Sequence, residues 1–148
     1  MKQIFTIGSS KKTAEKFFTM LTEHNVRCVI DVRLYNSYQL AGFSKYPDIK
    51  YFLKTIADID YISDNMFAPS AGLLTAYRNK EINWDEYTVN FTQIMELRGI
   101  IDYIATKYPD LDGHCLLCSE DKPDKCHRRL LAEMICDTFG EYELHHLF

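Results

Sequence analysis

The sequence has no long hydrophobic run, no low-complexity segment and only a small excess of charge of one sign. Its apolar runs fall far short of the roughly 20 residues that a helix needs to span a bilayer, and the run at residues 3–7 is too short for a signal peptide. The net charge of -4 argues against a broad nucleic-acid-binding face, although a local basic patch stays open. We expect one globular domain over residues 1–148 with no membrane partner.

Cysteine is present in an odd number, five, with no other sign of secretion. This pattern predicts free thiols in a reducing, cytoplasmic compartment. Cys28 and Cys136 fall on a predicted strand and a predicted helix face, where they are interpreted as inert core thiols. The other three lie close together in the sequence, in the segment that carries most of the candidate chemistry.

Short apolar strands alternate with amphipathic helices along the chain. We expect strands at residues 3–7, 26–32, 61–63, 114–118 and 144–148. We expect helices at residues 13–24, 48–56, 73–80 and 126–139, and a longer one from residue 83 that breaks at Gly99. This order predicts an α/β fold, with a three-layer, mostly parallel (Rossmann-like) sheet, helices on both faces and a helical insert.

Capping signals support these helices. Thr13, Asp48 and Asn83 are expected N-caps, and Gly140 is an expected C-cap. In parallel sheets, ligands collect at the carboxyl ends of the strands. This rule selects four loops, at residues 8–12, 31–46, 65–72 and 119–125.

The densest chemistry lies between Cys115 and Arg129. A strand delivers Cys118 to the sheet edge, and the next helix begins with Cys126, His127 and Arg128. Cationic side chains are unfavourable at a helix N-terminus, so their presence suggests an anion nearby. The same environment is expected to lower the pKa of Cys126 and make it nucleophilic.

Two kinds of anion fit this position. One is a phosphate or carboxylate ligand. The other is an acidic side chain of the loop itself, which would form local salt bridges with the cationic side chains. The acidic side chains of this loop are Glu120, Asp121 and Asp124.

Two further chemistries stay open for the cysteines. Cys115, Cys118, Cys126 and His127 offer soft ligands for zinc, but residues 115 and 118 of a strand point to opposite faces, so no metal is expected. A disulfide between Cys118 and Cys126 is sterically allowed across the loop and would act as a redox switch.

Two other segments reach the same predicted sheet edge. Asp31 and Arg33 lie on one side of a strand end, where Arg33 can offer a fork to an oxyanion. Asp31 can instead pair with Arg33 or Arg128 to orient the loops. Gly8 and Ser9 follow the first strand and can present backbone N–H groups to a phosphate, although they form neither a G-x-G-x-x-G motif nor a Walker loop.

Four short motifs resemble a bacterial and archaeal domain-of-unknown-function family, number 488 in that series. They are Thr6–Gly8, Asp31–Arg33, Leu116–Glu120 and Cys126–Arg128. The resemblance extends over essentially the whole chain, with Ser9 standing where many members have His. It implies an α/β fold and no established activity.

The residues favour an enzyme that acts on a phosphate-bearing or other anionic substrate without a cofactor. Cys118 or Cys126 would be the nucleophile or redox thiol, with His127 as acid or base and Arg33 and Arg128 as the anion clamp. The alternative is a non-catalytic module that binds a nucleotide or nucleic acid in the same pocket. A third hypothesis makes the loop a structural interaction surface.

Overall fold

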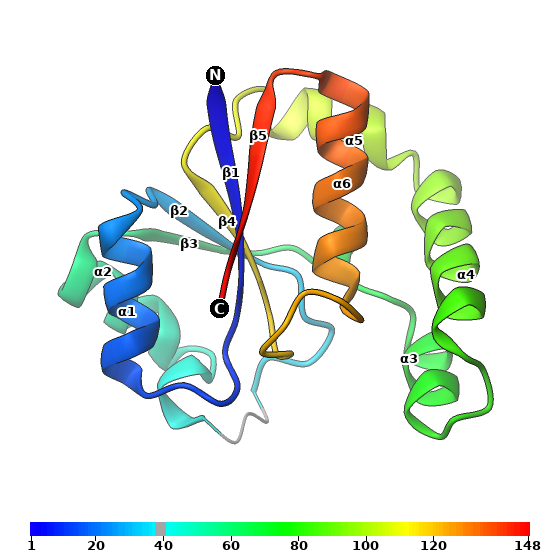
Figure 1. Ribbon diagram of the computed structural model, residues 1–148, viewed down its shortest axis with the longest axis horizontal. Helices are drawn as coiled ribbons and strands as arrows, with labels where there is room; N and C mark the ends of the chain where they lie inside the picture. Colours follow the sequence, from blue (N-terminus) through cyan, green and yellow to red (C-terminus); the bar gives the residue numbers. More distant parts are fainter. Residues whose placement is uncertain (38–40) are drawn as a thin grey trace.

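The computed structural model describes residues 1–37 and 41–148, and a five-stranded sheet lies at its centre (Figure 1). Every strand pairing in this sheet is parallel, and the order is β3-β2-β4-β1-β5. The strands are β1 (Lys2–Gly8), β2 (Cys28–Asp31), β3 (Asp60–Ser63), β4 (His114–Cys118) and β5 (Tyr142–Leu147). The predicted α/β fold with a parallel sheet is confirmed.

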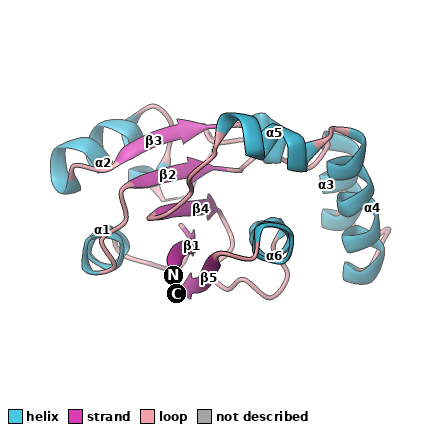
Figure 2. Ribbon diagram, turned by 90° about the horizontal axis from the view of Figure 1, so that it is seen from above, coloured by secondary structure: helices cyan, strands magenta, loops and turns pink. Residues whose placement is uncertain are grey.

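Helices cover both faces of the sheet and make three layers (Figure 2). α1 and α2 pack on one face and α5 and α6 on the other, while α3 and α4 stand beyond α6. The helices are α1 (Ala14–Glu23), α2 (Asp48–Ala57), α3 (Ala71–Arg78), α4 (Trp84–Leu97), α5 (Ile100–Lys107) and α6 (His127–Phe139). None of the helices in the described ranges has the length and apolar character needed to cross a membrane.

Alternation along the strands divides the buried side chains between two cores. On β4, Leu116 belongs to the core formed with α4, α5 and α6, whereas Cys115 and Leu117 pack with α1 and α2. Cys118 lies on the same side as Leu116. Cys115 and Cys118 therefore point to opposite faces, as their odd spacing predicts, and they cannot share a metal ion.

Most of the predicted helix ends are confirmed. The Thr13 side chain caps α1, Asn83 forms a capping box at the start of α4, and Gly140 ends α6 with a φ of 68°. The prediction for Asp48 is wrong, because Pro47 is the N-cap of α2 and already has a helical φ and ψ of -89° and 0°. Asp48 is the first helical residue instead, and there its carboxylate still faces the positive end of the helix dipole.

The loop after β3 fastens the insert to the sheet. Arg98, which ends α4, donates from Nη1 to three carbonyl oxygens of the segment at residues 65–68. The buried Asp64 accepts hydrogen bonds from the hydroxyls of Tyr103 and Tyr108 in and after α5. Burial alone would raise the pKa of Asp64, but these hydrogen bonds outweigh it and lower that pKa. These contacts hold α3 and α4 in place beside the edge of the sheet.

Candidate functional site

Three neighbouring strands deliver the predicted site residues to one edge of the sheet. β4 lies between β1 and β2, with Gly8 opposite Cys118 and with the pairing to β2 continuing up to Asp31. The carboxyl ends of these strands therefore meet, and α6 begins at the same edge (Figure 1). His127, the first residue of α6, contacts Cys118 there. The Asp31–Arg33 segment can meet the Cys118 loop only if β2 and β4 are neighbours. The two strands pair directly, so this condition is met.

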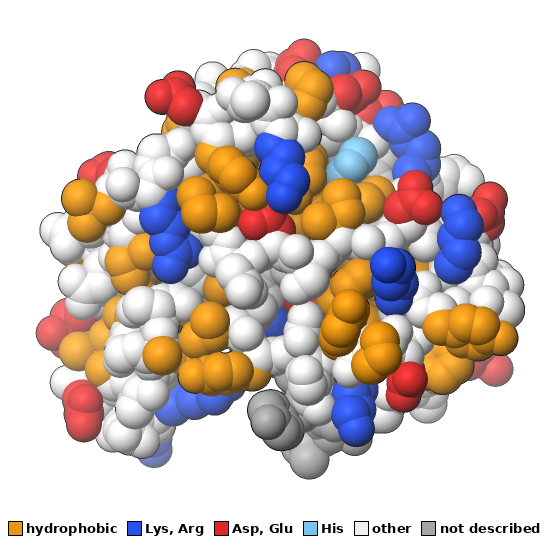
Figure 3. All heavy atoms as spheres, turned by 180° about the vertical axis from the view of Figure 1, so that it is seen from behind, with side chains coloured by type: hydrophobic (Ala, Val, Ile, Leu, Met, Phe, Trp, Pro, Cys, Tyr) orange, Lys and Arg blue, Asp and Glu red, His pale blue; other side chains and the backbone are white. Residues whose placement is uncertain are grey.

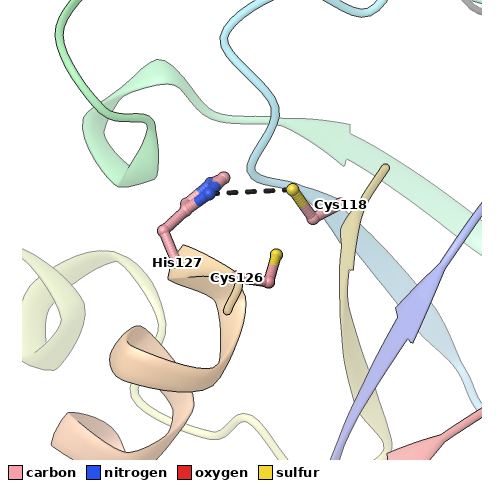
Figure 4. Close-up of side chains that lie close together, drawn as sticks. All are labelled: Cys118, Cys126 and His127. Atoms are coloured by element: carbon pink, nitrogen blue, oxygen red, sulfur yellow. Dashed lines mark hydrogen bonds between the residues drawn. The ribbon is translucent and has the colours of Figure 1, made fainter. Parts of the chain in front are cut away.

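Cys118 and His127 form a directly contacting pair (Figure 4). The Sγ atom of Cys118 lies 3.6 Å from Nδ1 of His127, and Nε2 of the same ring lies 2.8 Å from the carbonyl oxygen of Val32. A carbonyl oxygen only accepts, so Nε2 must carry a hydrogen. Nδ1 is therefore free to take the thiol proton, and the pair can exist as thiol and imidazole or as thiolate and imidazolium.

The surroundings of Cys118 stabilise its thiolate. A hydrogen bond from the thiol of Cys126 lowers the pKa of Cys118, against the effect of burial. The positive charge of Arg128 and the backbone N–H groups of Ser119 and Glu120 lower it further. A lowered pKa in a buried cysteine is typical of a reactive thiol rather than an inert one.

Cys126 has the opposite character, and the prediction that its pKa is lowered is wrong. Burial raises the pKa of Cys126 well above its usual value, and the hydrogen bond and negative charge of Cys118 raise it further. The sequence correctly places Cys126 at the helix start, where it is the N-cap of α6. Two thiols in contact cannot both ionise easily, and the more favourable surroundings belong to Cys118.

Asp31 and Arg33 form a buried ion pair with one donor left over. Nε and Nη2 of Arg33 lie 2.8 and 2.7 Å from the two carboxylate oxygens of Asp31, and Nη2 also donates to the carbonyl oxygen of Ser44. The hydroxyl of Tyr61 completes the coordination of Asp31. The Nη1 atom of Arg33 is buried and has no hydrogen-bond partner among the described residues. The side chain is only 3% exposed, and it lines the cavity described below. Such a donor is costly unless a ligand satisfies it.

Arg128 and Arg129 contact the loop that precedes them. Arg128 is fully buried and donates from its two terminal nitrogens to the carbonyl oxygens of Glu120 and Asp121, while Arg129 donates to that of Asp124. These partners are backbone groups, not the acidic side chains considered above. Arg128 thus fixes the loop and supplies charge, and its terminal nitrogens are already used. The side chain of Glu120 is exposed at the cavity.

Gly8 and Ser9 shape the site without offering amides to it. The backbone N–H groups of Ser9 and Ser10 donate to carbonyl oxygens at the start of the β4–α6 loop, so they are already paired. A Cβ atom on Gly8 would overlap the carbonyl oxygen of Glu120. The glycine therefore lets the two loops approach closely, and the predicted phosphate-binding role of its neighbouring amides has no free donors in the structure.

A cavity of about 1470 Å³ opens in front of the thiol pair. This exceeds the roughly 300–1,000 Å³ that is usual for small-ligand sites. Its cationic lining residues are Lys11, Arg33, Arg78, Lys80 and Lys125. Its acidic lining residues are Glu81, Glu86 and Glu120. Positive groups thus outnumber negative ones in the cavity lining, although Arg33 is already paired with Asp31.

The insert supplies an aromatic wall that sequence reasoning missed. Tyr77, Trp84 and Tyr87 line the cavity, and the rings of Trp84 and Tyr87 stack with centroids 5.1 Å apart. Phe91, one helical turn further along α4, packs against the ring of His127 at 5.5 Å. Helical spacing predicts that this stripe is the buried face of a helix, and Tyr87 and Phe91 are buried while Trp84 is partly exposed. The spacing alone does not show that the stripe borders a cavity and supports His127.

Three donor atoms of the site are also close enough to hold one soft metal ion. The Sγ atoms of Cys118 and Cys126 and a ring nitrogen of His127 all lie within 4.8 Å of one another. Two thiols and an imidazole suit zinc, once the thiols lose their protons. Cys115, part of the set considered from the sequence, has no place in it.

The fold and site define a class, a three-layer parallel α/β protein with a buried Cys–His pair at the carboxyl edge of its sheet. The family model described as Domain of unknown function DUF488 matches residues 13–135, so the chain belongs to this family and the predicted membership is confirmed. No curated protein and no solved structure matches the chain.

Proposed function

We propose that the protein is an enzyme that binds a small anionic, phosphate-bearing substrate in the cavity and attacks it with the thiolate of Cys118. The observation that carries this proposal is the contact of Cys118 with Nδ1 of His127, whose tautomer is set by the carbonyl oxygen of Val32. A nucleophile, a base and a group that orients the base form the constellation typical of thiol-dependent enzymes.

Each residue has a defined task in this mechanism. His127 takes the proton of Cys118, and the sulfur then forms a bond to the electrophilic atom of the substrate. The same proton passes from His127 to the leaving oxygen as its bond to that atom breaks. Water releases the group from the sulfur in a second step, in which His127 again acts as the base.

Two groups at the site can meet negative charge on the substrate. One is Nη1 of Arg33, which has no partner among the described residues and which Asp31 holds from the other side. The other is the positive end of the α6 dipole, whose N-cap Cys126 makes no side-chain capping hydrogen bond in the part of the chain that the structure describes. Helix N-termini and guanidinium groups are the usual binding partners of phosphate in proteins.

Ligand protection of the thiol tests this proposal. We expect iodoacetamide to modify Cys118 ahead of the half-buried Cys136, and a bound phosphate monoester to slow that modification. At a concentration ten times its dissociation constant, the ligand should slow the reaction about tenfold. Peptide mass spectrometry measures the rate at each cysteine, with sodium chloride at equal ionic strength as the control.

Turnover is measured in parallel as release of phosphate from a panel of monoesters. Cys118→Ser should abolish any release, whereas Cys136→Ser should leave it unchanged. If no member of the panel slows the alkylation of Cys118, the proposal of a phosphate-bearing substrate is wrong.

The second candidate is a non-catalytic module for a nucleotide or nucleic acid, and the aromatic wall favours it. Bases stack on such side chains, and Trp84 is the single tryptophan of the chain. Figure 3 shows basic and acidic side chains interspersed on the face seen from behind, which favours a nucleotide in the cavity over a long nucleic acid there. Nucleotides that quench Trp84 fluorescence and raise the Tm without turnover would select this candidate.

The state of the cysteines supports the proposal of a reducing, cytoplasmic environment. All five are free thiols, and Cys118 must be reduced to act as a nucleophile.

A further inference from the structure

The second thiol of the site forms no bond in the proposed reaction, yet its sulfur lies beside the nucleophile. Cys126 donates a hydrogen bond to Cys118, and the two sulfurs lie within 4.8 Å of each other. Both residues line the cavity, where Cys118 is 7% exposed and Cys126 is 3% exposed. Figure 4 shows the sulfur of Cys126 pointing from the start of α6 toward Cys118.

We propose that Cys118 and Cys126 form a reversible disulfide when a small hydroperoxide enters the cavity, with Cys118 as the sulfur that is oxidised and Cys126 as the thiol that resolves it. The inference rests on the proposed function in one respect, because it uses the same Cys118 nucleophile. It adds a modification site and a second class of reactant.

The chemistry balances in two steps. The Cys118 thiolate attacks the terminal oxygen of the hydroperoxide, the O–O bond breaks, and the departing oxygen takes up a proton. Cys118 is then a sulfenic acid. Cys126 loses its proton, its sulfur bonds to that of Cys118, and the S–O bond breaks to release water. One hydroperoxide is reduced to an alcohol or to water while two thiols become one disulfide.

The contacts assign the two roles. Cys118 faces the base, since its sulfur lies 3.6 Å from Nδ1 of His127. Cys126 lies at the N-cap of α6, and its sulfur is within 4.8 Å of the sulfur that it would attack. His127 contacts both sulfurs, so it can give a proton to the departing oxygen and accept the one that Cys126 loses.

Other thiols are badly placed to compete for a sulfenic acid at Cys118. Cys115 packs on the opposite face of β4. Cys28 and Cys136 belong to the core on the Cys118 side but do not line the cavity. The disulfide would therefore join Cys118 to Cys126, block the nucleophile, and return it when a dithiol reduces the bond.

The test is oxidation of the full chain with hydrogen peroxide, in buffer with a chelator that removes any metal from the three donor atoms. We expect the intact mass to fall by two hydrogens and to recover with dithiothreitol. Trypsin cleaves after Lys125, between the two cysteines, so their two peptides should stay linked until they are reduced.

Variants separate the roles of the thiols. In Cys126→Ser, Cys118 should gain oxygen atoms that dithiothreitol does not remove, because no thiol intercepts the sulfenic acid. Cys136→Ser is the matched control and should behave like the wild type.

Two results would overturn the inference. One is a linkage of Cys118 to a different cysteine, and the other is equally reversible oxidation in Cys126→Ser. If peroxide leaves the mass unchanged while iodoacetamide still modifies Cys118, the disulfide is wrong and the proposed nucleophile stands. If Cys118 reacts with neither reagent, both proposals fail.

Discussion

At pH 7, Cys118 of the His127→Gln variant is expected to react with iodoacetamide about 100-fold more slowly than Cys118 of the wild type. Glutamine is close to histidine in size and can still donate to the carbonyl oxygen of Val32. Its amide cannot take up the thiol proton, so the thiolate loses the imidazolium that stabilises it. Peptide mass spectrometry of the alkylated protein gives the rate.

His114→Gln is the matched control for this experiment. His114 lies at the opposite end of the same strand and contacts the backbone of Asp112. Its variant should alkylate at the wild-type rate, and equal Tm values would show that both variants fold. An unchanged rate in His127→Gln would remove His127 from the mechanism.

Replacing Arg33 with methionine should destabilise the protein by about 3–5 kcal/mol, because it leaves the Asp31 carboxylate buried without its partner. The free energy of unfolding is measured by urea denaturation. Arg27→Met is the control, since Arg27 forms an exposed pair with Asp112 whose loss should cost less than about 1 kcal/mol.

A double variant tests whether the charge is the cause. Asp31→Asn combined with Arg33→Met removes both charges, so it should be more stable than Arg33→Met alone. If the double variant loses as much free energy of unfolding as the two single variants lose together, lost packing dominates and the unpaired carboxylate does not.

Much of the arrangement around the site follows from local sequence signals. Alternation of apolar strands and helices predicts the parallel sheet, and a parallel sheet brings its strand ends to one edge. This is why Asp31, Arg33, Cys118 and His127 could be grouped before the structure was known. The order of the strands decides which of them touch, and β4 lying between β1 and β2 is a tertiary fact that no local signal carries.

The properties of individual groups are harder to predict, because they depend on partners from distant segments. Helix position alone predicts that Cys126 is the more acidic thiol, but burial and the neighbouring Cys118 reverse that order. In the same way, Arg128 has the right position for a ligand clamp, yet the loop returns close enough for its own carbonyl groups to take both terminal nitrogens.

The measurement that tests the central claim most directly is the pH dependence of alkylation at each cysteine of the wild type. His127 of α6, Arg33 beyond β2 and Tyr87 of α4 lie near the Cys118 thiol. The hydrogen bond from Cys126, the charge of Arg128 and the backbone N–H groups of Ser119 and Glu120 lower its pKa against the effect of burial. A lowered pKa means that the thiolate is already present at lower pH. Cys118 should therefore react first and reach half its maximal rate below pH 8.5, about the value for an ordinary cysteine. Half-maximal reaction of Cys118 at or above that pH, or reaction only after unfolding, would contradict the assignment of Cys118 as the nucleophile.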